Sequence, residues 1–128
     1  MRPVILNTME ENKLILEFLN TDVNNDGTYE LPQFGTIRPN GDFKTSFTAE
    51  QTKFHKDWNW IMEAVDKIED LSDEENNGEY FFEIYKFGVT IFSNGVYVNE
   101  IVNTSGKTKL EATYKAVVEF INYYNAIK

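Results

Sequence analysis

Cysteine is absent from the 128-residue chain, which also has a single histidine, three prolines and only 12 basic residues. Without cysteine there is no disulfide framework, no thiol nucleophile and no zinc site with thiolate ligands. A single imidazole supplies too few nitrogen ligands for a typical zinc or iron site. No apolar run approaches the roughly 18–20 residues of a membrane span, and no signal-peptide pattern follows the start. We therefore expect a cytoplasmic protein.

Basic residues are outnumbered by 21 acidic ones, so the net charge is −9. Direct binding to nucleic acid or to an anionic membrane is unfavourable, because contacts with phosphates need a basic face. A partner protein with a basic surface, or mimicry of nucleic acid, is compatible with this charge. Aromatic residues make up 15% of the chain and argue against disorder, since they supply apolar area to a core. The length fits a single domain over residues 1–128.

The negative charge is concentrated in one segment. Residues 66–79 contain seven acidic residues against Lys67 alone, which gives −6 of the total −9. This segment is either a binding surface for a basic protein or the solvated end of a helix and its loop, and charge runs are more often the second. The candidate partner contacts in this segment are Asp70, Asp73, Glu74 and Glu75.

Three helices are predicted. The first starts near Asn7 or Thr8, where Thr8 and Glu11 have capping-box spacing, and ends near Asn20. An irregular arm follows over about residues 21–47, punctuated by proline and glycine, with a turn at 38–42. The second helix starts at Thr48, which forms a capping box with Gln51. The third starts at Thr108 and runs nearly to the C-terminus, with Glu111 completing its capping box. The apolar face of the second helix comprises Phe54, Trp58, Ile61, Met62, Val65 and Ile68.

A small antiparallel sheet of two to three strands is predicted between Glu79 and Val102, after a solvated loop over 72–78. A turn at 85–88 is preferred to a bulge as the break in the first part. Asn94-Gly95 is a strong hairpin signal and, as a two-residue loop, would place Phe92 opposite Tyr97. The core side would then carry Val89, Ile91, Val96 and Val98. The fold class is α+β, with three helices packed on the sheet in the order αα-βββ-α.

Three aromatic residues are further candidates for partner binding: Trp60, Phe92 and Tyr97. Trp60 lies about 200° from Trp58 around a helix. It either packs beneath the irregular arm, which we prefer, or is an exposed anchor. Phe92 and Tyr97 would form an exposed aromatic pair if their face of the sheet is bare. Such a pair would mark a partner site or the interface of a symmetric homodimer.

One segment resembles a calcium-binding loop. Asp22, Asn24 and Asp26 take positions 1, 3 and 5 of a twelve-residue loop over 22–33, and Gly27 takes position 6. Positions 8, 11 and 12 depart from that pattern, and the last lacks the bidentate glutamate. The alternative is a polar loop that leaves the first helix, and a calcium site here would be weak. No other metal or cofactor is expected.

Enzymatic chemistry has little support. His55 lies at the edge of a helical apolar face, which is the ordinary position of a structural histidine. No Gly-x-Ser-x-Gly elbow is present to hold a serine nucleophile. An enzyme with a carboxylate site is the least favoured alternative, because no spacing brings two acids together.

Two blocks carry a resemblance. The stretch 54–69, which starts Phe-His-Lys-Asp-Trp-Asn-Trp, and the stretch 109–125 resemble small uncharacterised proteins of Bacteroidetes phages and prophages, as does the short piece 12–15. The order of elements is also similar to the phage ABA sandwich domain. The resemblance carries no catalytic residues. It implies a phage accessory protein in a bacterial cytoplasm, which with the acidity leads us to expect a non-enzymatic protein that binds a host or phage protein.

Overall fold

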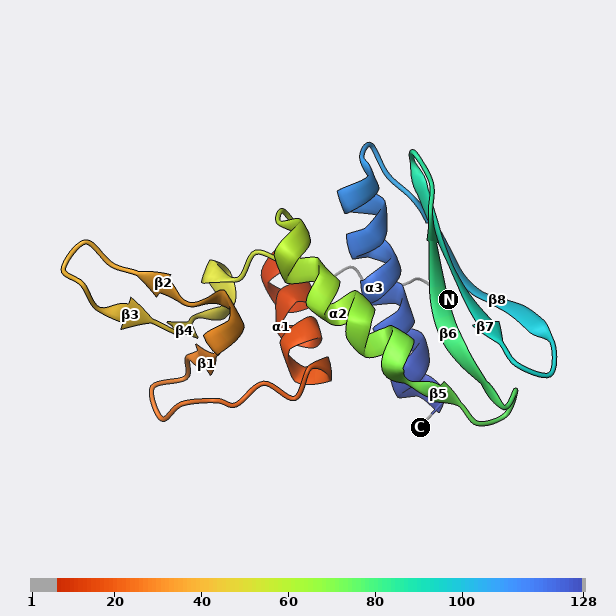
Figure 1. Cartoon of the computed structure of the whole chain (residues 1–128), viewed down its shortest axis with the longest axis horizontal. Coiled ribbons are helices and arrows are strands. Elements are labelled where there is room, and N and C mark those ends of the chain that lie inside the picture. The colour runs from red at the N-terminus through yellow and green to blue at the C-terminus, as the bar shows by residue number, and fades with distance from the viewer. Residues whose placement is uncertain (1–6, 128) are drawn as a thin grey trace. The chain divides into compact units, whose positions relative to one another are not determined.

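The computed structural model describes residues 7–127 and has an α+β fold, as predicted (Figure 1). Contacts divide the chain into two compact units, of which the first ends at Lys53 and the second begins at Phe54. The predicted order αα-βββ-α is wrong. Short strands separate the first two helices, and four strands rather than two or three precede the last helix.

The first unit contains one helix, α1 (Thr8–Phe18). Its start is as predicted, but its cap is Asn7 and not the pair Thr8 and Glu11. The Asn7 side chain accepts a hydrogen bond from the Glu10 backbone N–H at 2.8 Å. Near the predicted end, Asn20 takes a left-handed conformation with φ of 55°, which ends the helical path.

The strands of the predicted irregular arm are each two residues long, and they form two small sheets. β1 (Tyr29–Glu30) pairs with β4 (Ser46–Phe47), and β2 (Thr36–Ile37) pairs with β3 (Phe43–Lys44), all antiparallel. The turn between β2 and β3 closes with a hydrogen bond from Arg38 N–H to the Asp42 carbonyl at 2.7 Å. A short 3₁₀ helix, η1 (Pro32–Phe34), lies between the paired segments. The predicted turn at 38–42 is confirmed.

The prediction that the second helix starts at Thr48 is wrong. Gln51 does accept a hydrogen bond from the Thr48 N–H at 3.0 Å, but this capping box starts only the 3₁₀ helix η2 (Ala49–Gln51). η2 packs against α1, and the buried Asn12 side chain donates to the Thr52 carbonyl at 3.5 Å. A capping box fixes only the first turn, and here the chain leaves helical geometry at Thr52.

The second unit is built on a four-stranded antiparallel sheet with its strands in sequence order. Its elements are α2 (Trp58–Asp70), β5 (Ser72–Asp73), β6 (Gly78–Ile84), β7 (Gly88–Asn94), β8 (Val98–Ser105) and α3 (Lys109–Ile127). The two strands predicted around the 85–88 turn are β6 and β7, and Tyr85 N–H donates to the Gly88 carbonyl at 2.7 Å across that turn. The predicted solvated loop over 72–78 is too long, because β5 and the start of β6 pair at its two ends and only residues 74–77 form a turn.

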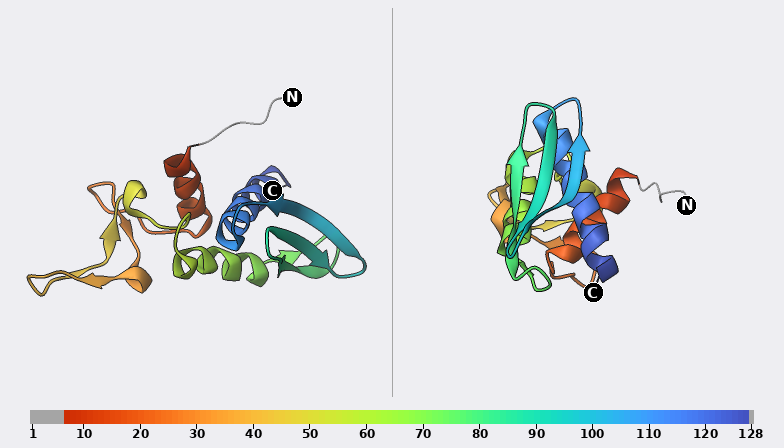
Figure 2. Two further views of the ribbon diagram at one scale, coloured as in Figure 1. Left: turned by 90° about the horizontal axis from the view of Figure 1, so that it is seen from above. Right: turned by 90° about the vertical axis from the view of Figure 1, so that its right-hand side faces the viewer.

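Both long helices of this unit lie on one face of its sheet. α3 packs against β7 and β8, and α2 packs against β6 and α3. Seen from the opposite side, the strands lie in front of these two helices (Figure 2, right). The inner face buries Tyr80, Val89, Ile91, Ser93 and Val102. The Tyr80 ring meets the Phe120 ring of α3 edge-on, with the ring centres 4.8 Å apart.

The predicted register of the last hairpin is wrong. Asn94 pairs with Val98, so Gly95, Val96 and Tyr97 form a three-residue loop instead of the two-residue turn at Asn94-Gly95. A bulge then shifts the register, with Phe92 opposite Glu100 and Ile91 opposite Val102. Val96 and Val98 are therefore exposed, at 79% and 63% of their surface, and do not join Val89 and Ile91 in the core.

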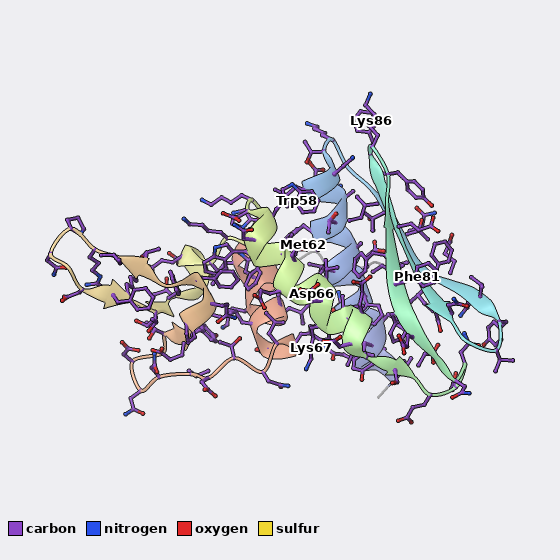
Figure 3. The ribbon with its side chains drawn as sticks, in the orientation of Figure 1. Trp58, Met62, Asp66, Lys67, Phe81 and Lys86 are labelled. Atoms are coloured by element: carbon purple, nitrogen blue, oxygen red, sulfur yellow. The ribbon has the colours of Figure 1, made fainter. Side chains whose placement is uncertain are left out.

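Of the two tryptophans, Trp60 is buried and Trp58 is exposed. The 6% exposure of Trp60 contradicts the exposed-anchor alternative, and the 39% exposure of Trp58 shows that the prediction of Trp58 in the core is wrong. Phe54 precedes α2 instead of belonging to it, and its ring meets that of Trp60 edge-on at 5.3 Å. Trp58, Met62 and Asp66 follow one another along the exposed side of α2 (Figure 3).

The cap of α2 gives a first prediction. The Asp57 side chain accepts a hydrogen bond from the Asn59 N–H at 2.8 Å at the start of the helix. Asp57→Ala should lower the free energy of unfolding by about 1 kcal/mol, because an N-terminal N–H loses its acceptor. Equilibrium urea unfolding measures this, and Asp57→Ser, which keeps a capping oxygen, is the control. Equal stability of Asp57→Ala and the wild type would contradict a stabilising role of the Asp57 cap.

Candidate functional site

Two clefts open beside the segment of highest negative charge. One, of about 570 Å³, lies between β5, β6 and the end of β7, and the other, of about 350 Å³, lies between β5 and the end of α3. Ser72, Asp73, Glu74 and Tyr80 line both clefts. Glu79 and Phe81 line the first only, and Glu75 and Tyr124 the second only. The turn that joins β5 to β6, residues 74–77, is called the acidic turn below.

Asn76 holds the acidic turn in place. It is 1% exposed, and its amide nitrogen donates to the Ser93 hydroxyl at 2.9 Å and to the Tyr97 carbonyl at 2.8 Å. Its amide oxygen accepts from the Tyr97 N–H at 3.1 Å, and its backbone carbonyl accepts from the Val96 N–H at 2.8 Å. The acidic turn and the β7–β8 loop are therefore joined by several hydrogen bonds.

Two glycines allow this close approach. A Cβ at Gly78 would overlap the backbone of Asn94, and a Cβ at Gly95 would overlap the carbonyl of Asn76. Asn77 has φ of 50°, a left-handed conformation that asparagine tolerates better than most residues. The sequence Asn-Asn-Gly is typical of a solvated turn, and its tolerance of a left-handed backbone is the one sequence signal for this ordered structure.

The acidic residues of this region are not neutralised by neighbouring bases. Asp70, Glu74, Glu75 and Glu79 are exposed, and no lysine or arginine among residues 7–127 forms an ion pair with them. Asp73 differs, because it is half-buried and its carboxylate accepts a hydrogen bond from the Ser93 hydroxyl at 2.5 Å. The predicted acidic contacts thus comprise three exposed carboxylates and one, Asp73, that is tied into the sheet.

Tyrosines form the apolar wall between β6 and α3. Tyr80 is 2% exposed, and burial raises the pKa of its phenol well above the usual 10, with the negative charge of Asp73 as the next cause. Burial, again followed by Asp73, also raises the pKa of Tyr123. Both phenols therefore stay neutral donors beside the carboxylates.

The structure brings together some of the aromatic candidates and separates others. Tyr97 is 56% exposed and lies in the loop that Asn76 joins to the acidic turn, so it adjoins the exposed acids. Phe92 is half-buried on the sheet face away from α3, stacked on Phe81 with 5.1 Å between ring centres. Trp60 is buried and is therefore not an exposed anchor.

The proposed calcium ligands form a closed hydrogen-bonded turn. The Asp26 carboxylate accepts from the Thr28 N–H at 3.0 Å and from its hydroxyl at 2.6 Å, which lowers the pKa of Asp26. The Asn24 amide nitrogen donates to the Thr28 hydroxyl and to the Glu30 carboxylate, and Asp22 is exposed. These bonds account for the shape of the loop. Among residues 7–127, no three histidine or acidic side chains are grouped as metal ligands.

His55 is placed as a structural residue would be. It is half-buried, and its ring meets that of Tyr114 edge-on with 6.1 Å between ring centres. Burial, followed by the positive charge of Lys56, lowers its pKa. Neither cleft beside the acidic turn is lined by His55.

Comparison of the chain with protein-family models, with curated proteins and with solved structures finds no match in any of the three. Within residues 7–127, no helix combines the length and apolar character needed to cross a membrane.

The bonds of Asn76 give a second prediction. Asn76→Ala should lower the free energy of unfolding by about 2–3 kcal/mol, because several buried groups lose their partners. Amide exchange at Val96 and Tyr97 should also accelerate. Urea unfolding and hydrogen exchange measure the two effects, with the exposed Asn99→Ala as the control. Slow exchange at Tyr97 in the variant would contradict the role assigned to Asn76.

The raised pKa of Tyr80 gives a third prediction. The unfolded phenol ionises near pH 10 and the folded one only at higher pH, so stability present below pH 10 is lost as the pH rises above it. Tyr80→Phe should therefore make the free energy of unfolding fall less steeply between about pH 9.5 and 11. Urea unfolding across that range measures the slope. The exposed Tyr97→Phe is the control, and an unchanged slope in Tyr80→Phe would refute the assignment.

Proposed function

We propose that this protein is a non-enzymatic accessory protein of a phage or prophage, and that it binds a partner protein with a basic surface through the acidic turn. The observation that carries the proposal is that exposed, unpaired carboxylates stand on a turn fixed by buried hydrogen bonds. Glu74 and Glu75 precede Asn76, and the exposed Tyr97 is joined to the same residue. The phage assignment rests on the sequence resemblance alone.

The fixed turn favours binding over a merely solvated charge run. A flexible acidic loop loses conformational entropy when a partner orders it, which reduces affinity. Here Asn76 and the close packing at Gly78 and Gly95 already order the backbone. Binding would then cost little further entropy. Uncompensated negative charge would also accelerate association with a basic partner.

A partner protein fits this surface better than nucleic acid does. Phosphates would be repelled by a segment with a net charge of −6. A sharper form of the proposal is that the acids imitate a nucleic-acid backbone and occupy the binding face of a host DNA- or RNA-binding protein. Inhibition of that host protein would follow.

The test is capture of partners from a bacterial host lysate by the wild type and by a charge-reversed variant. Asp70→Lys, Glu74→Lys and Glu75→Lys together should abolish capture of the specific partner, and rising salt should weaken its binding to the wild type, because the contact is electrostatic. Asp73 is left intact because it bonds to Ser93. Competition by duplex DNA would support mimicry in particular.

The matched control carries the same charge change elsewhere, as Glu17→Lys, Asp22→Lys and Glu50→Lys. These three acids are exposed in the first unit. Equal loss of the partner in both variants would mean that only total charge matters. Full retention of the partner by the variant with Asp70→Lys, Glu74→Lys and Glu75→Lys would refute the proposal.

A further inference from the structure

The outer face of the sheet in the second unit carries acidic residues but no basic ones on its strands. Neither α2 nor α3 covers this face, because both pack on the other side (Figure 2, right). The strands β6, β7 and β8 contain no lysine or arginine, and their three acids are Glu79, Glu83 and Glu100. Glu79 and Glu83 lie one and three positions from the buried Tyr80 on β6, which places them on the opposite, outer face. Glu100 pairs with the outer residue Phe92, because the bulge at Ile101 shifts the register of β8.

Two phenylalanines, Phe81 and Phe92, lie on the outer face between these three acids. Phe81 pairs with Phe92, and Phe92 pairs in turn with Glu100. Glu79 and Glu83 flank Phe81 on the same strand, two residues away on either side, and so share its face. The two Phe rings stack with 17° between their planes, and both residues are half-buried. An apolar platform thus has carboxylates on three sides.

We propose that this platform receives an arginine side chain of the partner protein, an inference that rests on the proposed function and names the chemistry of its anchor. Arginine combines an apolar stem and a planar guanidinium that packs on aromatic rings with donors for several carboxylates. Lysine presents a strongly hydrated point charge and gains less from the rings. The face is continuous with the acidic turn, because Glu79 and Phe81 also line the larger cleft there.

Charge decides between a partner protein and a second copy of this chain. A symmetric dimer through this face would place its three acids near the same acids of the other copy, with no base in the strands to compensate. A surface with arginine is complementary instead. The only base of the β6–β7 hairpin is Lys86 in its turn, where its ammonium lies 5.3 Å from the Phe87 ring centre.

The test uses hexa-arginine and hexa-lysine peptides of equal charge, titrated into the isotopically labelled full chain and followed by the NMR signals of its backbone amides. Hexa-arginine should shift the amides around Phe81, Phe92 and Glu100, and should bind more tightly than hexa-lysine. Phe81→Thr with Phe92→Thr should weaken hexa-arginine about fivefold. Glu79→Gln with Glu100→Gln should weaken it by a similar factor.

Controls and contrary outcomes separate this inference from the proposed function. Phe87→Leu removes an exposed ring outside the platform and should leave affinity unchanged. If the variant with Phe81→Thr and Phe92→Thr fails to fold, the affinity of the variant with Glu79→Gln and Glu100→Gln tests the inference. Shifts confined to 70–77, equal affinity for the two peptides, or no binding would overturn the inference. The proposed function would still be supported if the charge-reversed variant with Asp70→Lys, Glu74→Lys and Glu75→Lys no longer captured the partner. Concentration-dependent shifts of the platform amides without peptide would assign the face to a second copy.

Discussion

Asn76 is a neutral side chain buried within the most acidic part of the chain, and the arrangement of the candidate site depends on its hydrogen bonds. Its side-chain amide donates to the Tyr97 carbonyl and accepts from the Tyr97 N–H. The same amide donates to the Ser93 hydroxyl, which in turn donates to the Asp73 carboxylate. A buried amide left without these partners would cost free energy, so the bonds specify one geometry for two loops. Carboxylates that would otherwise repel one another are thereby held at one end of the sheet.

What the sequence predicts well is local. The third helix begins where Thr108 and Glu111 indicate, with the Thr108 hydroxyl accepting from the Glu111 N–H at 3.1 Å. The break at 85–88 and the α+β class are also correct. Each of these follows from neighbouring residues, since caps and turns satisfy backbone groups within a few positions.

The predictions that fail are those that depend on contacts between residues distant in sequence, or on a strand register that can shift by one residue. The β7–β8 register moves because the loop holds three residues and a bulge follows, and a slip of one residue exchanges the faces of a strand. The prediction for Trp58 fails because α2 begins only at Trp58, and Phe54, from outside the helix, packs on Trp60. The site itself could be predicted only as a charge run. Nothing near Asn76 in the sequence indicates that Ser93 and Tyr97 are its partners.

The one-sided packing of the sheet explains why its two faces differ so sharply in chemistry. Covering the inner face with α3 requires apolar or hydrogen-bonded residues there, so the acids of β6 and β8 occupy the outer positions. Solubility alone would be served by lysine and glutamate in mixture, and edge strands commonly carry lysine. A face with three acids, no base and two stacked phenylalanines departs from that pattern. The arginine anchor that we propose accounts for this departure, because charge of one sign around an apolar centre is complementary to a cation with an apolar stem.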